Sequence, residues 1–130
     1  MPRWTAEGLP ADPLERATAI QDRASELGFD WPEAAPVWDK IAEELQELRE
    51  AIAGGQEAQI RHEWGDVLFA LINLARFLPI EPQQALEQVN QRFDSRLQGV
   101  QALLDAAGLD WDACSLDELE ELWQQAKKQR

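Results

Sequence analysis

The sequence predicts an all-α protein, and three observations carry that prediction. Tyrosine is absent, valine and isoleucine are few, and no Asn-Gly pair marks a β-hairpin turn. Apolar residues instead recur three and four positions apart along most of the chain, which is the period of an amphipathic helix. Glycines and prolines delimit most of these periodic segments. We therefore expect a bundle of about five helices.

The first helix is expected to follow an irregular leader. Residues 1–11 contain two prolines and one glycine without apolar periodicity. Asp12 then has the character of an N-cap, Pro13 suits the first helical position and Glu15 the capping box. Gly28 is expected to end this helix. At 130 residues, the length suits one domain, which we place at residues 12–130.

The second and third helices are expected at about residues 37–53 and 57–78. Gly54 and Gly55 end the second helix, and Pro79 ends the third. The apolar stripe of the second helix, expected to face the core, consists of Ile41, Leu45, Leu48 and Ile52. That of the third consists of Trp64, Val67, Leu68, Leu71, Ile72 and Ala75.

Two further helices complete the prediction. The fourth is expected from Pro82 to about Ala107, with an apolar stripe made of Leu86, Val89, Phe93, Leu97, Val100 and Leu104. Ser115 and Glu118 have the spacing of a capping box, which predicts the start of a last helix.

Charge and composition exclude several function classes. A formal net charge of −13 would repel DNA and RNA, so no nucleic acid polymer is expected as a partner. No apolar run is long enough to span a membrane, and the N-terminus lacks the pattern of a secretory signal. The single cysteine, Cys114, suits a reducing compartment. These features predict a cytoplasmic protein.

Two acidic motifs are the principal candidates for a functional site. Glu44 and Glu47 lie three positions apart in the second helix, as do Glu63 and Asp66 in the third. Residues at this spacing project from one stripe of a helix. If the two helices pack side by side, the four carboxylates converge, and such a cluster favours a hard divalent cation such as Mg²⁺. The alternative is two solvated acidic faces.

Basic residues near these motifs could receive phosphate. Arg92 and Arg96 lie one helical turn apart, and arginine binds phosphate bidentately; ion pairing with neighbouring acids is the alternative. Lys40 lies one turn before Glu44 and could bind phosphate or pair with that glutamate. His62, the only histidine, matches Mg²⁺ poorly, so we expect it to face solvent.

In the last helix, Trp123 and Lys127 lie one turn apart. They could offer a nucleotide a stacking face and a charge, whereas packing against the rest of the fold is the alternative for Trp123.

These residues lie in segments that together resemble the C-terminal catalytic domain of the bacterial MazG nucleoside triphosphate pyrophosphohydrolases. The resemblance covers about residue 14 to the C-terminus. It is carried by the order and spacing of residues 28–32, 40–47, 63–70, 73–76, 90–96 and 122–127. Typical bacterial members have two such repeats, whereas this chain has one.

The resemblance implies an all-α fold with a core of four helices that surround each active site, and it implies a homodimer or a higher homo-oligomer. It implies Mg²⁺-dependent hydrolysis of NTPs and dNTPs to the monophosphate and pyrophosphate, with Mn²⁺ as a substitute ion, in a nucleotide house-cleaning role. It further implies that the metal ligands are Glu44, Glu47, Glu63 and Asp66, that phosphate is bound by Arg92 and Arg96, and that the base is contacted by Trp123 and Lys127. The position of Arg92 is typically lysine in the family, which keeps the charge.

Two other functions remain open at this stage. One is a narrower hydrolase for damaged or non-standard nucleotides, with the same chemistry and a different base pocket. The other is an acidic helical interaction or oligomerisation module without activity. The acidic quartet and the arginine pair favour an enzyme over the second alternative.

Overall fold

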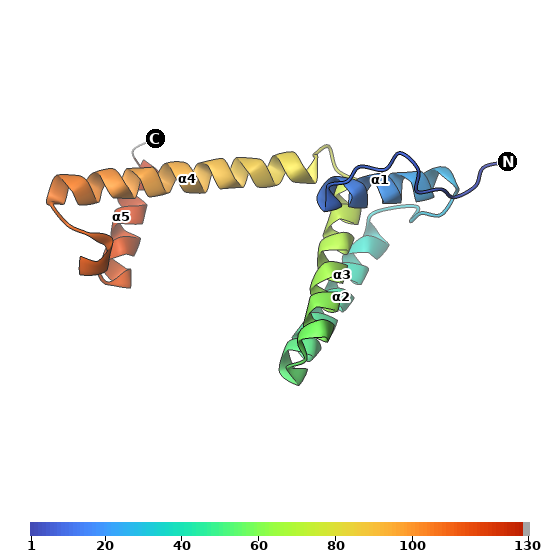
Figure 1. Ribbon diagram of the computed structural model, residues 1–130, viewed down its shortest axis with the longest axis horizontal. Helices are drawn as coiled ribbons and strands as arrows, with labels where there is room; N and C mark the ends of the chain where they lie inside the picture. Colours follow the sequence, from blue (N-terminus) through green and yellow to red (C-terminus); the bar gives the residue numbers. More distant parts are fainter. Residues whose placement is uncertain (129–130) are drawn as a thin grey trace. The chain divides into compact units, whose positions relative to one another are not determined.

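The computed structural model describes residues 1–128 and is all-α over that range, as the sequence predicts (Figure 1). It contains no β-strand within those residues. Its elements are α1 (Pro13–Glu26), α2 (Ala35–Gly54), α3 (Glu57–Ala75), α4 (Pro82–Ala107), the 3₁₀ turn η1 (Trp111–Ala113) and α5 (Leu116–Lys128). None of these helices is long and apolar enough to cross a membrane.

The chain divides into two compact units, Met1–Gln84 and Ala85–Arg130. Each unit has its own cluster of buried apolar residues. The single domain expected at residues 12–130 stays a prediction, and its last two residues, Gln129 and Arg130, lie outside the described residues.

Local signals place three of the helix ends where the sequence predicts them. The Glu15 backbone N–H donates to Asp12 Oδ2 at 3.0 Å, which caps α1. Before α5, Ser115 and Glu118 form a reciprocal capping box, with N–O distances of 3.1 and 3.2 Å. Gly28 ends the first helical segment with φ +88°, a left-handed conformation that costs glycine little.

The third helix is shorter than predicted. It ends at Ala75 rather than Leu78, because the chain tightens there into turns in which Phe77 and Leu78 donate to carbonyls three residues earlier. Pro79 keeps the helix from continuing beyond these turns, since the residue before a proline, here Leu78, is disfavoured in the α conformation.

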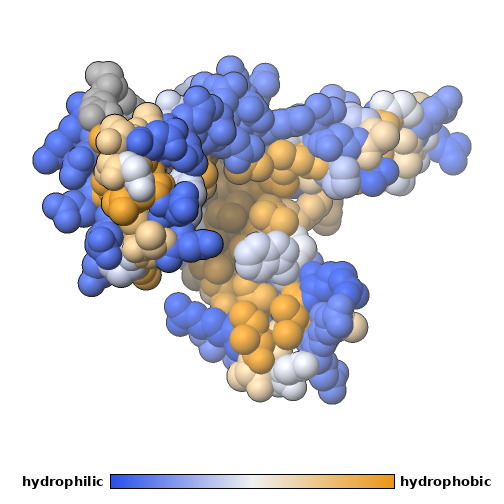
Figure 2. Space-filling view, turned by 60° about the vertical axis from the view of Figure 1, so that its left-hand side comes forward, coloured by the Kyte–Doolittle hydropathy of each residue, from blue (hydrophilic) through white to orange (hydrophobic). Residues whose placement is uncertain are grey.

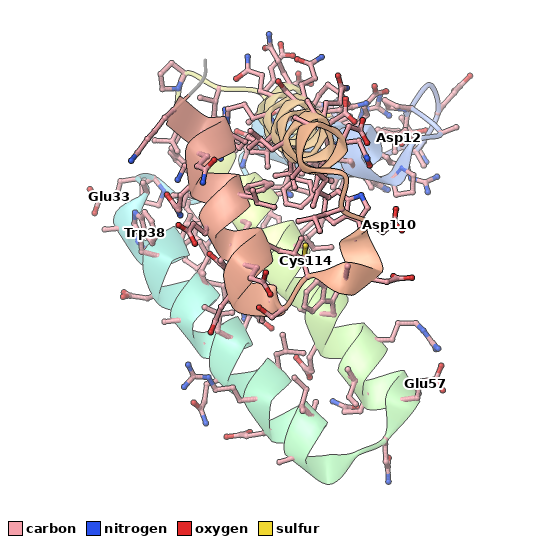
Figure 3. The ribbon with its side chains drawn as sticks, turned by 90° about the vertical axis from the view of Figure 1, so that its left-hand side faces the viewer. Asp12, Glu33, Trp38, Glu57, Asp110 and Cys114 are labelled. Atoms are coloured by element: carbon pink, nitrogen blue, oxygen red, sulfur yellow. The ribbon has the colours of Figure 1, made fainter. Side chains whose placement is uncertain are left out.

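In the first unit, α2 and α3 form an antiparallel hairpin (Figure 3). These two helices pack against each other more extensively than α1 packs against α3. Trp38 marks the start of α2, and Glu57 lies at the opposite end, beside the turn. The core of the hairpin consists of Val37, Ile41, Ala70 and Leu74. The hairpin therefore aligns the acidic motif of α2 with that of α3.

The predicted core stripes are only partly correct. Ile41, Leu48, Val67, Ile72 and Ala75 are buried as expected, but the most exposed members of the stripes are Leu45, Ile52, Trp64, Leu68 and Leu71. A two-helix hairpin can cover only one side of each helix, so the other side of a wide apolar face stays open. Apolar side chains accordingly gather on the outside of the hairpin, in the lower part of Figure 2.

In the second unit, α5 packs against the C-terminal half of α4. Val100, Leu104 and Ala126 form the buried cluster, whereas Leu86, Val89 and Phe93 of the predicted α4 stripe are exposed. Gly99 permits α4 and α5 to approach each other closely, because a Cβ at this position would lie 3.0 Å from Ala126 Cβ. The helix therefore tolerates a residue that costs about 1 kcal/mol relative to alanine in a helix interior.

Candidate functional site

Three carboxylates from two helices converge in the first unit. Glu44 and Glu47 come from α2 and Glu63 from α3, and one oxygen of each lies within 4.8 Å of the other two. The α2–α3 hairpin makes this possible, since it sets the two acidic motifs side by side. The sequence-based expectation that these motifs meet therefore agrees with the geometry for three of the four acids.

Burial makes this convergence chemically unusual. Glu44 is 5% exposed and Glu63 is 7% exposed. Oε2 of each residue is buried and has no hydrogen-bond partner within residues 1–128. Buried charges are costly unless they are paired or coordinate a metal. The two free oxygens and the all-oxygen donor set therefore fit a hard divalent cation such as Mg²⁺.

Lys40 places a positive charge beside these carboxylates. Its Nζ lies 3.0 Å from Glu44 Oε1 and 3.6 Å from Glu43 Oε1. The hydrogen bond to Glu44 raises the pKa of Lys40 above its usual value. The alternative considered for Lys40, a pair with Glu44 along α2, is therefore present in the structure.

The pKa of Glu47 reflects the crowding of negative charge. Partial burial of its carboxyl and the charges of Glu44 and Glu63 raise this pKa above the usual value. Glu47 is half-buried, whereas Glu44 and Glu63 are buried, so Glu47 is the member of the trio open to solvent.

Gln59 is a contributor that the sequence analysis missed. Its Nε2 donates to Glu63 Oε1 at 2.9 Å and holds that carboxylate from one turn earlier in α3. The spacing of four residues is a signal that could have identified it.

Asp66 lies in a second group of potential metal ligands, which consists of His62, Glu63 and Asp66 and therefore shares Glu63 with the first. One donor atom of Asp66 lies within 4.8 Å of donor atoms of His62 and Glu63. Asp66 is half-buried, and its Oδ2 lies 3.3 Å from His62 Nε2. The fourth acid of the predicted quartet is therefore joined to the others through Glu63, with the histidine beside it. His62 is 65% exposed at its side chain, as expected from the sequence.

In the second unit, Arg92 and Arg96 line one open hollow of about 520 Å³. The other lining residues are Gln88, Gln91, Ser95, Gly99 and Ala126. Arg96 is half-buried, and its Nε has no hydrogen-bond partner in the described part of the chain. No ion pair of either arginine occurs among residues 1–128, so the alternative of pairing with nearby acids is not realised there. The hollow is thus polar, cationic and open.

Trp123 and Lys127 lie one turn apart on α5, as predicted. Trp123 is half-buried, and its ring centroid lies 5.1 Å from the ring centroid of Phe93. The guanidinium carbon of Arg96 lies 5.8 Å from the same Trp123 centroid. Lys127 is exposed. Trp123 therefore contributes to packing in this unit, and its contact with a nucleotide base stays a prediction.

A second charged cluster was missed by the sequence analysis. Arg76, at the end of α3, donates to both oxygens of Asp30 at 3.1 and 2.8 Å, to Asp22 at 2.9 Å and to Asn73 at 2.6 Å. The hydrogen bond from Arg76 holds the pKa of Asp30 well below its usual range. This clamp fixes the loop after Gly28 against α1 and α3.

A comparison with protein families matches residues 36–100 to the MazG nucleotide pyrophosphohydrolase domain. The matched segment includes Glu44, Glu47, Glu63, Asp66 and the arginine pair.

Individual relatives extend the similarity over most of the chain. A nucleoside triphosphate pyrophosphohydrolase of Escherichia coli (strain K12) is 41% identical over 125 residues, which cover 93% of this chain and 46% of the relative. The nucleoside triphosphate pyrophosphohydrolase/pyrophosphatase MazG of Thermotoga maritima is 38% identical over 114 residues, which cover 88% of this chain and 44% of the relative. The chain thus spans just under half the length of these two relatives.

Proposed function

Because this chain belongs to the MazG nucleotide pyrophosphohydrolase family, we propose that it hydrolyses nucleoside triphosphates to the monophosphate and pyrophosphate with the help of Mg²⁺. Mn²⁺ is the proposed substitute ion. The relatives are named for this activity, and they support its extension to the present chain. The proposed role is house-cleaning of the nucleotide pool, with the cytoplasm as its setting.

The convergence of three carboxylates with two unpartnered buried oxygens is the observation that carries the proposal. An interaction module without activity would not need this arrangement, because exposed acidic faces give solubility at lower cost than buried, mutually repelling charges. The proposed ligands are the four acids Glu44, Glu47, Glu63 and Asp66.

The reaction adds water to the α-phosphorus and breaks its bond to the oxygen that bridges to the β-phosphorus. The products are a nucleoside monophosphate, pyrophosphate and one proton. A divalent ion, when bound, supplies positive charge beside the phosphates and makes water acidic enough to attack near neutral pH. We assign Glu47 to orient this water and accept its proton, because Glu47 is open to solvent whereas Glu44 and Glu63 are buried.

Other residues of the chain would bind the substrate. Arg92 and Arg96 are proposed to bind the β- and γ-phosphates, since their hollow is open and the Arg96 Nε is unpartnered within the described residues. Lys40 is proposed to contact phosphate once a metal ion replaces it as the counter-charge of Glu44. Trp123 and Lys127 are proposed to contact the base.

We propose that the chain forms a homodimer through the outer faces of α2 and α3. Leu45, Ile52, Trp64, Leu68 and Leu71 are 45–58% exposed there, and a contiguous apolar surface of this kind favours association. A second copy of the hairpin would bring four helices together, the number that the family resemblance implies. Because a second copy of the chain carries the same apolar face, the two copies can bury these faces against each other.

A panel of canonical and modified nucleoside triphosphates, assayed for pyrophosphate release with and without Mg²⁺, tests the proposal. Release from at least one triphosphate that depends on the ion and is lost in Glu63→Gln is the expected result. The matched control is Glu43→Gln, because Glu43 lies in the same motif as Glu44 but is exposed. Absence of pyrophosphate release across the panel would contradict the proposal and favour the interaction module.

A further inference from the structure

We propose that a hollow between α1, the loop that follows α1 and α3 binds the nucleobase of the triphosphate. The hollow has a volume of about 440 Å³, and all of its lining residues belong to the first unit. This inference rests on the proposed function, because it places the base of the same substrate whose α-phosphate would lie beside the acids. It adds contacts from the first unit to those proposed for Trp123 and Lys127 of the second.

Three aromatic side chains line this hollow. Phe29 and Trp31 come from the loop after α1, and Phe69 comes from α3. Phe29 is 82% exposed, and the other two are 43% and 45% exposed, although aromatic rings are normally largely buried. Stacking on aromatic side chains is open to every nucleobase, since each base has a π-face. A planar heterocycle is therefore the class of ligand that would cover these rings.

Gln21 of α1 contributes a buried polar group to the same hollow. The residue is 7% exposed, and its Oε1 is buried and accepts no hydrogen bond from any residue in the range 1–128. Its Nε2 makes a long hydrogen bond of 3.4 Å to the Phe69 carbonyl oxygen, and the terminal torsion of a glutamine is soft, so the amide can turn towards a ligand. Because a buried acceptor without a donor is costly, an amino or ring N–H group of a base would be favoured here.

Arg76 holds the wall of the hollow in place. It donates to both oxygens of Asp30 at 3.1 and 2.8 Å, and Asp30 stands between Phe29 and Trp31 in the loop. Arg76 Nη1 also donates to Asn73 Oδ1 at 2.6 Å, so the amide nitrogen of Asn73 is the end of that side chain that remains to donate to a ligand. Asn73 lines the hollow as well. The aromatic residues of the loop are therefore positioned before a ligand binds, which lowers the entropic cost of binding.

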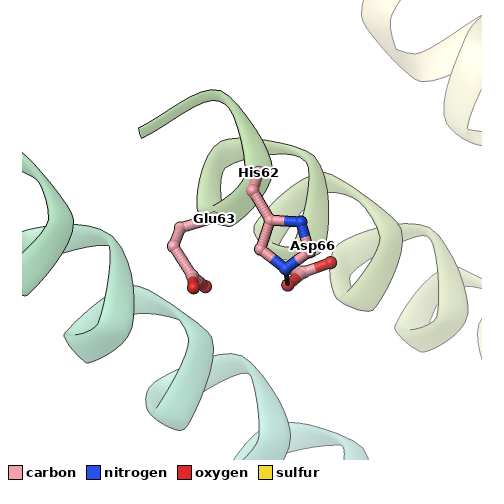
Figure 4. A group of neighbouring side chains, drawn as sticks. All are labelled: His62, Glu63 and Asp66. Atoms are coloured by element: carbon pink, nitrogen blue, oxygen red, sulfur yellow. Dashed lines mark ion pairs between the residues drawn. The ribbon is translucent and has the colours of Figure 1, made fainter. Parts of the chain in front are cut away.

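Helix α3 connects the hollow to the acidic cluster. Asp66, drawn in Figure 4 beside His62, lies three residues before Phe69 and seven before Asn73. Residues at this spacing share one side of a helix, and seven residues extend about 10 Å along its axis. A nucleotide whose α-phosphate lies beside the acids can therefore direct its base into the hollow.

The first test separates binding of the base from binding of the phosphates. Calorimetry with Mg²⁺ uses the α,β-methylene analogues of ATP, CTP, GTP and UTP, which resist hydrolysis at the α–β bridge, and inorganic tripolyphosphate as the probe without a base. Trp31→Leu is expected to weaken binding of the best-bound analogue by about tenfold or more and to leave the affinity for tripolyphosphate unchanged. Trp38→Leu is the matched control, because Trp38 is an exposed tryptophan of α2 outside the hollow, and it should change neither affinity. Unchanged affinity of Trp31→Leu for the analogue would overturn the proposal.

Gln21→Met provides the second test, since it removes the amide while keeping a side chain of similar length. Binding of the same analogue is expected to weaken by about tenfold, again without a change for tripolyphosphate. Circular dichroism and thermal unfolding establish that the variant is folded. An equal loss of affinity for the analogue and for tripolyphosphate would show that Gln21 acts on the structure and not on the base.

Photolabelling locates the base directly. Labelling with 8-azido-ATP and 5-azido-UTP, followed by peptide mapping, is expected to modify the segment with Phe29 and Trp31 or the segment with Phe69. A label confined to the α5 segment that contains Trp123 would overturn the proposal. Wild-type binding of tripolyphosphate reports on the phosphate and metal site alone. Absence of binding by tripolyphosphate and by all analogues would refute the proposed function, whereas equal affinity for tripolyphosphate and every analogue would refute only the binding of a base in the hollow.

Discussion

Lys40 Nζ lies 3.0 Å from Oε1 of Glu44, a residue that is only 5% exposed. The pair partly compensates the negative charge that Glu44, Glu47 and Glu63 concentrate between α2 and α3. A metal ion at the proposed site would act on the same carboxylate as Lys40, so removing the lysine should make the protein depend more strongly on the metal.

Lys40→Met is expected to lower the free energy of unfolding without metal by about 1 kcal/mol, a value reduced for the partial exposure of the lysine. The stabilisation gained on adding Mg²⁺ should be larger than in the wild type, because the ion then replaces the missing charge. Thermal unfolding with and without Mg²⁺ measures both effects. Arg61→Met is the control, since it removes an exposed pair with Glu57. An equal Mg²⁺-induced shift in Lys40→Met and wild type would show that the lysine does not compensate the cluster.

Glu47→Gln is expected to reduce kcat for pyrophosphate release by about a hundredfold or more, because it removes the proposed proton acceptor. The same change should stabilise the metal-free protein. The raised pKa of Glu47 means that the folded state binds its proton more tightly than the unfolded chain, so its ionisation disfavours folding above that pKa.

For the wild type without metal, Glu47 therefore adds stability as the pH falls through its folded-state pKa towards 4.5, and Glu47→Gln removes this dependence. Denaturant unfolding at pH 7 and pH 5 measures it, with Glu43→Gln as the control. Near-normal turnover by Glu47→Gln would contradict its assignment to the reaction. Lower stability of this variant at pH 7 would contradict the electrostatic argument.

Arg76→Met is expected to destabilise the protein by about 2 kcal/mol at pH 7, because charged hydrogen bonds to Asp30 and Asp22 are lost. The pKa of Asp30 is lowered in the folded state, so the stability from this pair is fully present above the unfolded value of 3.8 and is lost as the pH falls below it. The difference between wild type and variant should therefore shrink below pH 3.8. Urea unfolding followed by circular dichroism at pH 7 and pH 3 provides the test, and a difference independent of pH would argue against the ionic clamp.

Arg96→Lys is expected to raise KM for the triphosphate by about tenfold, because lysine keeps the charge but loses the planar fork that binds phosphate bidentately. Arg92→Lys should have a smaller effect, since Arg92 is exposed whereas Arg96 is half-buried with a free Nε. Steady-state kinetics of pyrophosphate release distinguish the two variants. Arg16→Lys, at an exposed position of α1, is the control. An unchanged KM in Arg96→Lys would contradict the assignment of Arg96 to the phosphate site.

Leu68→Glu is expected to convert a dimer into a monomer, because it places a charge in the apolar outer face of α3. Gel filtration with light scattering at micromolar concentration measures the mass. Leu116→Glu is the control, since Leu116 is 76% exposed but lies at the start of α5. A wild-type mass of about 15 kDa, that of one chain, would contradict the proposed dimer.

Structural features that depend on residues close together in the sequence could be predicted from it. The caps at Asp12 and Ser115 and the ending at Gly28 were predictable, because each depends on residues within a few positions. The pairing of the two acidic motifs was also predictable, since a short connection forces consecutive helices to pack.

Other features depend on contacts that spacing cannot reveal. Leu45 and Trp64 share the apolar periodicity of the core residues, but a hairpin buries only one face, so periodicity alone could not identify them as exposed. Arg76 and Asp30 are 46 positions apart, and their pairing arises only when the loop after α1 reaches the end of α3.

Calorimetric titration of Mg²⁺ into the wild type, Glu44→Gln and Glu63→Gln tests the central claim most directly, namely that carboxylates of α2 and α3 share one divalent ion. Circular dichroism confirms that each variant is folded. Binding weakened by about tenfold or more in both variants is the predicted result, because each removes a ligand from a different helix. Unchanged Mg²⁺ affinity in either variant would contradict a site shared by the two helices.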